Sequence, residues 1–249
     1  MPLIKFKSLS FQDVIESKIS DHDPILIETL YGMFCFFNIL CRCDTRQPSG
    51  FNNAFNRIET LEEYTKRLKT ITEILAELQQ TQQIVGFMLQ EAPNLQHKEE
   101  GDVASFFYKE LKSKLPYFEV DALKFARKTH KTRSCLFSAF DLRVFPKQIP
   151  MFDKSPGRSQ EIQLIDSQGK QLRAINIHGD HRNQAKTSKL VIHSAKKGAI
   201  LGGDLNIFSN TKEALAMKEE LQHLRSVQLC IVKARLFSTL DAAIFTQVP

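Results

Sequence analysis

Short apolar runs of strand length, each ending beside or enclosing a polar side chain, constrain the fold of this chain more than any other feature. Between these runs lie stretches whose apolar residues recur with the 3.6-residue period of an amphipathic helix. Strands and helices therefore alternate, and no linker, internal repeat or low-complexity tract divides the 249 residues. The pattern predicts one α/β domain that spans 1–249.

The apolar and turn patterns place the individual elements. Strands are expected at 25–29, 33–41, 84–89, 134–145, 161–166, 171–177, 199–203 and 242–246. Helices are expected at 60–80, 102–114, 184–196 and 212–225. The connection between the first two strands is too short for a parallel crossover, so they should form an antiparallel hairpin. A second tight hairpin turn is expected at 166–169.

Charge and cysteine usage restrict the partners and the compartment. The formal net charge is +6 and the pI is about 9.0, which is typical of a protein with a polyanionic partner such as nucleic acid or an anionic lipid surface, and equally of a plain, slightly basic exterior. Five cysteines do not pair evenly, and no apolar leader precedes Lys5, so we expect a monomer in the reducing cytoplasm, with non-classical export left open. The longest apolar stretch, 33–41, is too short to span a bilayer.

Polar side chains with phosphoryl-transfer chemistry recur at the strand ends. Asn38 interrupts an apolar run, Glu91 follows Gln90 at the end of another, and His178 ends a third. Hydrolysis of a phosphate ester needs hard ligands for a divalent cation, a base for water and donors for the phosphoryl oxygens. Each residue alone also has a structural explanation, as a cap, a bulge or a satisfied core amide.

The run Gly203-Asp204-Leu205-Asn206 is the more specific signal. Strand alternation should place Asp204 and Asn206 on one face of the sheet. A zinc pair formed by His178 and His181 is the alternative at the preceding strand, but no third ligand has a suitable spacing.

Together with Ser20-Asp21-His22-Asp23-Pro24, these motifs resemble those of the endonuclease/exonuclease/phosphatase family of metal-dependent phosphoesterases. In that family the Ser-Asp-His-x-Pro motif closes the chain, whereas here it opens it. The site residues otherwise follow the family's cyclic order, so the sequence looks circularly permuted. The resemblance implies a four-layered α/β sandwich of two packed mixed sheets flanked by helices.

The resemblance also implies roles for the site residues. Metal ligands would be Asn38, Glu91 and Asp21, with Mg²⁺ as the ion and Mn²⁺ as an alternative. The implied catalytic residues are His22, His178, Asp204, Asn206 and Asp241, the last of them orienting His22. The basic residues around the expected cleft, rather than the resemblance, indicate Arg133 and Arg182 as substrate-binding residues. The segment 92–160 matches the family only loosely, and within it 130–143 is the best match to the family's phosphate-contacting Tyr or Arg.

The expected function is that of a magnesium-dependent, nuclease-like phosphodiesterase acting through metal-activated water. A phosphatase of phosphoinositides or another small phosphate ester is the first alternative, although the chain has no Trp for the Trp-containing motif of the inositol-polyphosphate 5-phosphatases. A catalytically inactive binding module that keeps the fold is the second.

Overall fold

The computed structural model describes residues 7–8, 19–20, 22–42, 58–120, 133–151, 159–223, 227–233 and 239–246, and for 7–8, 227–233 and 239–246 it describes the backbone alone. Within this part of the chain no helix is both long and apolar enough to cross a membrane.

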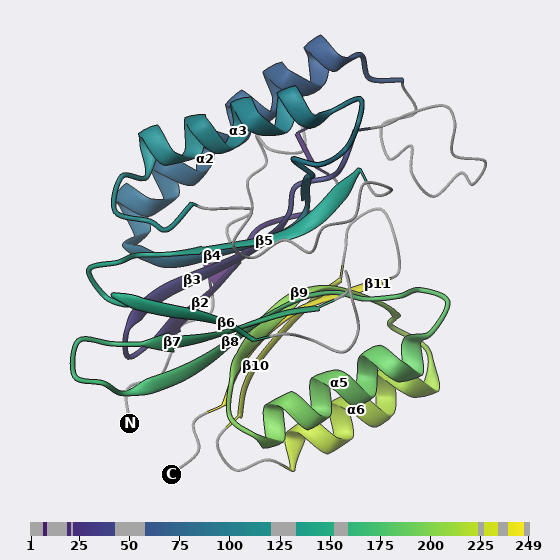
Figure 1. Cartoon of the computed structure of the whole chain (residues 1–249). Helices are drawn as coiled ribbons and strands as arrows, with labels where there is room; N and C mark the ends of the chain where they lie inside the picture. Colours follow the sequence, from purple (N-terminus) through teal and green to yellow (C-terminus); the bar gives the residue numbers. More distant parts are fainter. Residues whose placement is uncertain are drawn as a thin grey trace.

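Two β-sheets lie face to face between two pairs of helices (Figure 1). The first sheet has the strand order β1 (Lys7–Ser8), β2 (Ile25–Thr29), β3 (Gly32–Asn38), β4 (Ile84–Pro93), β5 (Ser134–Phe140). The second has the order β10 (Val227–Lys233), β11 (Thr239–Thr246), β9 (Ile200–Phe208), β8 (Gln171–His178), β7 (Ser159–Ile165), β6 (Lys147–Met151). Helices α2 (Leu61–Gln82) and α3 (Gly101–Lys114) cover the first sheet, and α5 (Gln184–Lys196) and α6 (Lys212–Gln222) cover the second. The predicted four-layered α/β sandwich is confirmed.

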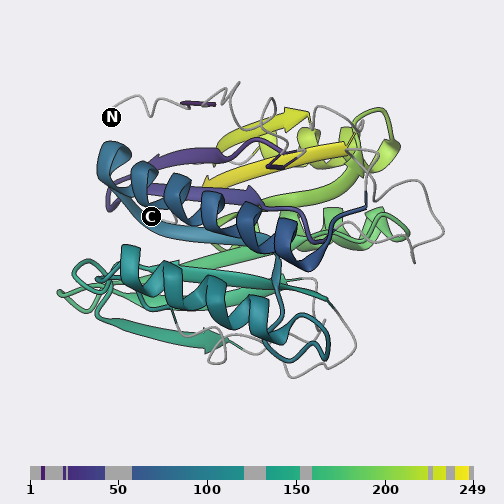
Figure 2. The same ribbon diagram turned by 90° about the horizontal axis from the view of Figure 1, so that it is seen from above.

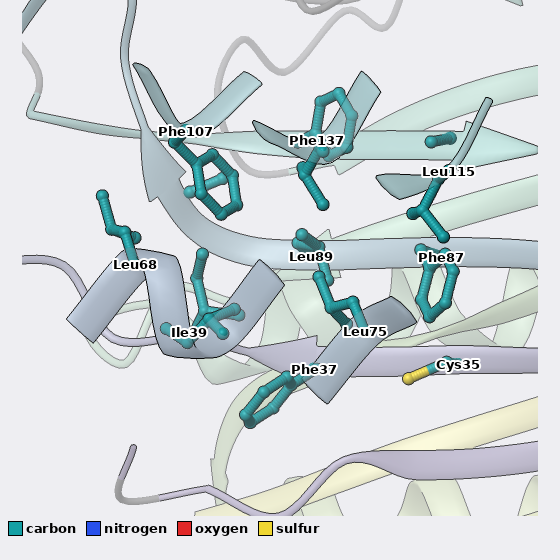
Figure 3. Close-up of a cluster of buried hydrophobic side chains, with 14 of the residues drawn as sticks. Cys35, Phe37, Ile39, Leu68, Leu75, Phe87, Leu89, Phe107, Leu115 and Phe137 are labelled. Carbon is teal, nitrogen blue, oxygen red and sulfur yellow. The ribbon is translucent and has the colours of Figure 1, made fainter. Parts of the chain in front are cut away.

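Each pair of adjacent layers encloses its own apolar core. Seen from above, α2 and α3 lie side by side over the first sheet (Figure 2). Figure 3 shows the core beneath them, where Leu68 and Leu75 of α2 meet Phe37 and Leu89 of the strands. A second core, which includes Phe34 and other residues of both sheets, fills the space between the sheets, and a third lies under α5 and α6. Burial of this apolar area on both faces of each sheet is what holds the layers in place.

Most of the expected elements form close to their expected bounds, and the exceptions have local causes. The strand expected at 134–145 ends at Phe140, because the Asp141 carboxylate accepts a hydrogen bond from the Arg143 N–H at 2.9 Å and turns the chain. Strand β6 was not predicted; it contains Pro150 and lies at the edge of its sheet, where a missing N–H is tolerated. Strands β1 and β10 were also missed.

Strands β2 and β3 form the predicted antiparallel hairpin, with a register that runs from Ile25 opposite Phe36 to Thr29 opposite Gly32. The turn needs Gly32, whose φ is +122°. This hairpin is where a permuted chain would join the ends of the family's ordinary chain. The circular permutation itself stays a prediction.

Moving residues 1–29 to follow Pro249 through a short Gly/Ser linker tests the permutation. We expect a folded, active protein, because the spatial arrangement of the strands is unchanged. Circular dichroism and a hydrolysis assay check it, and deletion of residues 1–24 should abolish activity because it removes Asp21 and His22. A rearranged protein that folds but is inactive, or an active truncation, would contradict the permutation.

Candidate metal centre

The candidate centre lies where the carboxyl ends of two parallel strand pairs face each other. In the first sheet β3 and β4 run parallel, with Asn38 opposite Gln90. In the second sheet β8 and β9 run parallel, with His178 opposite Asp204. Side chains at the carboxyl ends of parallel strands meet at one edge of a sheet, so the two registers bring the predicted site residues Asn38, His178 and Asp204 to one place.

Glu91 reaches this place through a break in the regular strand. Strict alternation would put it on the same face as Leu89, which is buried in the core beneath α2 and α3. The register of β4 with β5 shifts between Leu89 and Ala92, and Glu91 has a φ of +56°. A bulge of this kind re-aims a side chain, and here it turns the carboxylate toward the second sheet.

Glu91, His178 and Asp204 form a compact group of three potential ligands, with one ligand atom of each lying within 4.8 Å of the others. His178 Nε2 is 3.6 Å from Glu91 Oε1 and 3.7 Å from Asp204 Oδ2. Asn38 Nδ2 bridges the carboxylates and donates to Asp204 at 3.1 Å and to Glu91 at 3.3 Å. The Glu91 side chain is 17% exposed and that of Asp204 is 4% exposed, so both carboxylates are largely shielded from water.

The Glu91 carboxylate is stabilised in its charged form. Burial by itself would raise its pKa, but the facing His178 and hydrogen bonds from Cys41 and Asn38 outweigh burial and lower the pKa to about 2. The Cys41 N–H contributes the shortest of these bonds, 2.8 Å to Oε2. The Glu91 carboxylate is therefore anionic at neutral pH, as its predicted role of metal ligand requires.

Asp204 is held from its own strand and from the loop beside it. Asn206 donates to it twice, from its N–H to Oδ1 at 2.9 Å and from Nδ2 to Oδ2 at 3.1 Å. Nδ2 of Asn206 also donates to the Gly179 carbonyl at 3.2 Å. A Cβ at Gly179 would lie 1.8 Å from the Leu205 carbonyl oxygen, so glycine is required for this approach.

His22 enters the same group from the amino-terminal segment. Its side chain is buried, with Nε2 3.9 Å from Asp204 Oδ2. Ser20 anchors the segment, because its Oγ donates to the Asn38 carbonyl at 2.6 Å and accepts from the His22 N–H at 3.2 Å.

The remaining predicted site residues are not seen in contact with the candidate ligands, in two cases because their side chains are not described. Asp21 is outside the described residues. The Asp241 backbone lies opposite Asp204 in the register of β11 with β9, but its side chain, and hence the expected contact with His22, is not described. Arg133 Nη1 lies 3.6 Å from Glu100 and its Nη2 3.7 Å from Glu99. Arg182 is exposed in the turn that follows β8.

Beneath the centre, a network of buried amides joins the two sheets. Gln90 Nε2 donates to Asn176 Oδ1 at 2.6 Å, and Asn176 Nδ2 donates to the carbonyls of Leu89 and Phe137 and to Ser138 Oγ. In the sequence Gln90 precedes Glu91 and Asn176 lies two residues before His178, but nothing there indicates that the two amides bind each other across the sheets.

Backbone strain is also concentrated at the centre, and the apolar periodicity of the sequence could not have predicted this strain. In the described chain four non-glycine residues have left-handed φ, and three of them, Leu40, Glu91 and Asn206, lie here. The fourth, Gln83, caps a helix. Strained backbone that concentrates at one place is typical of functional sites.

The side chains fit a divalent metal ion. Two carboxylates that share Asn38 and His178 as neighbours carry like charges in a shielded place, which is unfavourable without a cation. The carboxylate oxygens of Glu91 and Asp204 suit Mg²⁺ or Mn²⁺, which prefer oxygen ligands to an imidazole such as that of His178. Asn38 Oδ1 accepts from the Leu40 N–H at 3.0 Å, so its amide presents Nδ2 to the carboxylates, and metal ligation by Asn38 stays a prediction.

Solved structures share this arrangement of layers and strands. An endonuclease/exonuclease/phosphatase from Bacteroides vulgatus superposes with a TM-score of 0.52 at 12% identity, over 85% of this chain and 86% of its own. A family protein from Bacteroides thetaiotaomicron gives 0.51 at 13% identity, over 85% and 80%. The chain has the endonuclease/exonuclease/phosphatase fold.

A mannosyl-6-phosphatase from Bacteroides thetaiotaomicron VPI-5482 also has the endonuclease/exonuclease/phosphatase fold, with a TM-score of 0.51 at 14% identity over 85% of this chain and 84% of its own. By sequence, no protein-family model and no curated protein matches the chain. The similarity to these solved structures is therefore one of fold, and it was not found by sequence comparison.

Gly203→Ala tests how closely the sheets must approach. A Cβ at Gly203 would lie 2.1 Å from the Ile177 carbonyl and 2.8 Å from Gln90 Nε2, at a φ of +129°. We expect a loss of about 2–4 kcal/mol in the free energy of unfolding, from overpacking and strain together. Urea unfolding measures it.

Gly169→Ala is the matched control for Gly203→Ala. It also has positive φ, +80°, but nothing lies within 4 Å of the added Cβ. It should lose only about 1–2 kcal/mol, the cost of the left-handed conformation alone. Equal losses in the two variants would show that close approach at Gly203 is not required.

Proposed function

We propose that this chain is a metal-dependent phosphoester hydrolase and that nucleic acid is its substrate. The observation that carries the proposal is the group Glu91, His178 and Asp204, within 4.8 Å of one another in a shielded place between the sheets. The fold adds support, because it is shared with proteins described as endonuclease/exonuclease/phosphatases.

Each residue of the group has a distinct task in the proposed reaction. Glu91 holds the cation, with Asp21 and Asn38 as further predicted ligands. A bound Mg²⁺ would neutralise phosphate charge and polarise the phosphorus. Asp204 orients the attacking water and accepts its proton, a role that its three hydrogen bonds from Asn38 and Asn206 support by holding the carboxylate fixed.

The two histidines serve the phosphoryl oxygens. His178 lies between the carboxylates of Glu91 and Asp204, and it donates from the second sheet. His22 reaches the centre from the amino-terminal segment and donates to the scissile phosphate. Asp241 fixes the tautomer of the His22 imidazole. Donors placed on rigid strands stabilise the developing negative charge without reorganisation.

The charge of the chain favours nucleic acid as the substrate. The net charge is +6, and the exposed basic residues Arg182, Lys186 and Lys189 lie on the turn and the helix that follow His178. Cations beside the reacting phosphate bind its neighbouring phosphates in a polyanion.

A phosphatase of a small phosphate ester is the second candidate function. The specific observation that favours it is that a mannosyl-6-phosphatase has the same fold over 85% of this chain. Phosphoinositides belong to the same candidate class of substrates.

A substrate panel separates the candidates. Plasmid DNA, single-stranded RNA, phosphoinositides and mannose 6-phosphate are assayed with Mg²⁺, with Mn²⁺ and with excess EDTA. We expect metal-dependent cleavage of nucleic acid that falls steeply as salt rises, because phosphate contacts are electrostatic. Release of phosphate from the small esters alone would replace the nuclease by the phosphatase. No turnover with any substrate would favour the inactive binding module.

Glu91→Gln tests the centre directly. The change keeps the shape of the side chain and removes the charge, so we expect activity to fall about a hundredfold or more, because metal-borne charge stabilisation is worth several kcal/mol. Turnover is measured against Mg²⁺ concentration, with a melting curve to show that the variant folds.

The matched control for Glu91→Gln is Glu161→Gln. Glu161 lies on β7 and accepts a 2.7 Å hydrogen bond from Arg173, away from the candidate ligands. It should keep the activity of the wild type. Near-normal turnover of Glu91→Gln at low Mg²⁺ would contradict the assignment of Glu91 as a metal ligand.

A further inference from the structure

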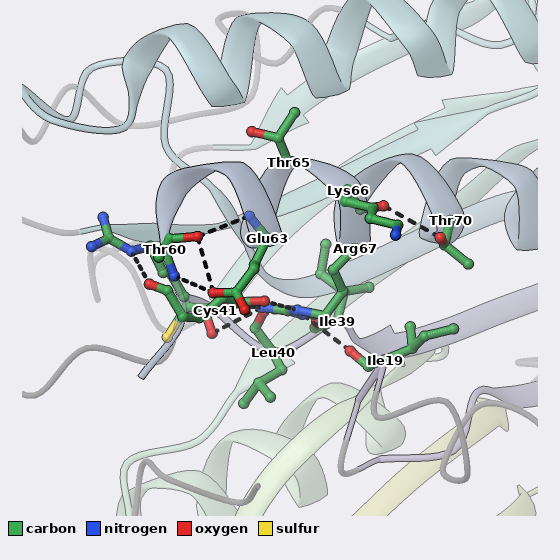
Figure 4. A network of polar contacts seen from close by, with 12 residues as sticks. Ile19, Ile39, Leu40, Cys41, Thr60, Glu63, Thr65, Lys66, Arg67 and Thr70 are labelled. Atoms are coloured by element: carbon green, nitrogen blue, oxygen red, sulfur yellow. Dashed lines mark hydrogen bonds and ion pairs between the residues drawn. The ribbon is translucent and has the colours of Figure 1, made fainter. Parts of the chain in front are cut away.

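A buried arginine on α2 binds both chain segments that frame the centre. Arg67 lies in the second turn of the helix and points down between 39–41 and Ile19 (Figure 4). Its side chain is 4% exposed, and that of its partner Glu59 is 2% exposed. Arg67 Nε and Nη2 bind the two oxygens of the Glu59 carboxylate at 2.8 and 2.9 Å, which is the bidentate geometry that fixes a guanidinium in one plane.

The rest of the guanidinium is committed to backbone carbonyls. Nη1 donates to the carbonyl oxygens of Ile39 at 2.8 Å, Leu40 at 2.9 Å and Ile19 at 3.0 Å. Nη2 donates to the carbonyl of Cys41 at 3.3 Å. One side chain therefore joins two segments that are far apart in the sequence, and neither segment belongs to a regular element.

The first of these segments, 39–41, positions the Glu91 carboxylate. The Cys41 N–H donates to Glu91 Oε2 at 2.8 Å. Leu40 has a left-handed φ of +59°, a conformation that a leucine adopts only when its surroundings impose it. The Arg67 contacts on either side of Leu40, together with the bond from its N–H to Asn38, supply that constraint.

The second segment carries His22. Ile19 is followed by Ser20, whose Oγ joins the His22 N–H to the Asn38 carbonyl. With the Ile19 carbonyl held by Arg67 and Ser20 held by β3, two anchors fix the chain immediately before the imidazole.

We propose that Arg67 is a positioning residue, which holds His22 and the Cys41 N–H in fixed positions relative to each other and to the candidate metal centre. The proposal rests on the function proposed above for the same site. Arginine has five N–H donors in one plane, and with one N–H of Nη1 shared between two carbonyls it binds the carboxylate and all four carbonyls, which no other side chain can do. A buried ion pair kept for stability alone would not need the carbonyl contacts, and such pairs are weak sources of stability.

The start of α2 keeps the two partners in register. Thr60 and Glu63 form a reciprocal capping box, with the Thr60 N–H donating to Glu63 Oε2 at 2.8 Å and the Glu63 N–H donating to Thr60 Oγ1 at 3.2 Å. This fixes the first turn of the helix directly after Glu59, so the Glu59 carboxylate and Arg67 lie about two turns apart on the same side of the helix, within reach of both side chains.

Arg67→Lys is the first test. Lysine keeps the charge and can satisfy part of the carbonyl set, but it cannot hold all of the contacts. We expect kcat to fall roughly 10- to 100-fold with KM nearly unchanged, because the catalytic groups are misplaced while substrate contacts remain. Kinetics are measured well below the melting temperature of the variant.

Leu78→Ala is the matched control. Leu78 is buried on the same helix, about three turns further along, which places it roughly 16 Å from Arg67 along the helix axis. Cavity formation lowers the melting temperature without touching the carbonyls of 39–41 or Ile19. We expect the wild-type kcat for the folded protein. An equal fall of kcat in both variants would overturn the positioning role, since stability alone would then explain it.

A second readout does not depend on any substrate. Amide NMR spectra of uniformly ¹⁵N-labelled wild-type and Arg67→Lys protein should differ mainly at Ile19, His22 and 39–41. The rise in melting temperature caused by Mg²⁺ should also be smaller in the variant, because Glu91 loses its fixed partner. Unchanged amide positions in a folded variant would overturn the proposal.

Glu59→Gln serves if Arg67→Lys does not fold. Gln keeps the volume and one acceptor, so Arg67 stays in place but less firmly, and kcat should fall by a smaller factor with the same amides shifted. Wild-type kcat and wild-type amide positions in Glu59→Gln would overturn the proposal. If the wild type cleaves no phosphate ester and Mg²⁺ does not raise its melting temperature, the proposed function fails, and the amide shifts alone decide whether Arg67 orders the two segments.

Discussion

The candidate centre depends on the side-chain amide of Asn176, which holds the two sheets together at the edge where the centre forms. The oxygen of this amide accepts a hydrogen bond from Gln90, and its nitrogen donates to two backbone carbonyls and to Ser138 Oγ. All of these partners belong to the first sheet, whereas Asn176 belongs to the second. Apolar contacts alone let packed sheets slide, because the hydrophobic effect has no direction. Buried hydrogen bonds do not allow this, since each unpaired group would cost free energy. Glu91 comes from one sheet and Asp204 from the other, so their separation is set by this network.

Stability and function make opposite demands on this edge. Two shielded carboxylates stand close together, Glu91 and Asn206 have left-handed backbone, and Leu40 is held in the same conformation. Each of these features is unfavourable in isolation. The surrounding donors, from Asn38, Cys41 and Asn206, stabilise the charged forms, and Arg67 restrains the loop. The rigid sandwich tolerates the strain because its three apolar cores lie elsewhere, on the broad faces of the sheets.

Most of the fold could be predicted from the sequence because its elements are long and strongly patterned. The helix at Leu61–Gln82 has an apolar stripe and a capping box, and the hairpin at Ile25–Asn38 has a connection too short for any other pairing. The misses lie at the edges. Strand β6 carries Pro150 and little apolar pattern, while β10 is an edge strand whose β-branched residues at 227–232 were a readable signal. The weak pattern of β6 explains why it was missed, whereas β10 was missed although its pattern was readable.

The sequence by itself determined which side chains could do chemistry, because carboxylates, amides and imidazoles stood at the ends of apolar runs: Asn38, Glu91, His178 and Asp204. It did not determine how they are aimed. Glu91 has the wrong parity for its face, and only the bulge in β4, formed against β5, turns it toward Asp204. Likewise Arg67 reads as one more polar residue on an amphipathic helix, and its contacts with Ile19 and 39–41 exist only once α2 lies on the first sheet. Local pattern records burial and spacing, whereas these contacts join segments whose distance in the chain carries no information about their distance in space.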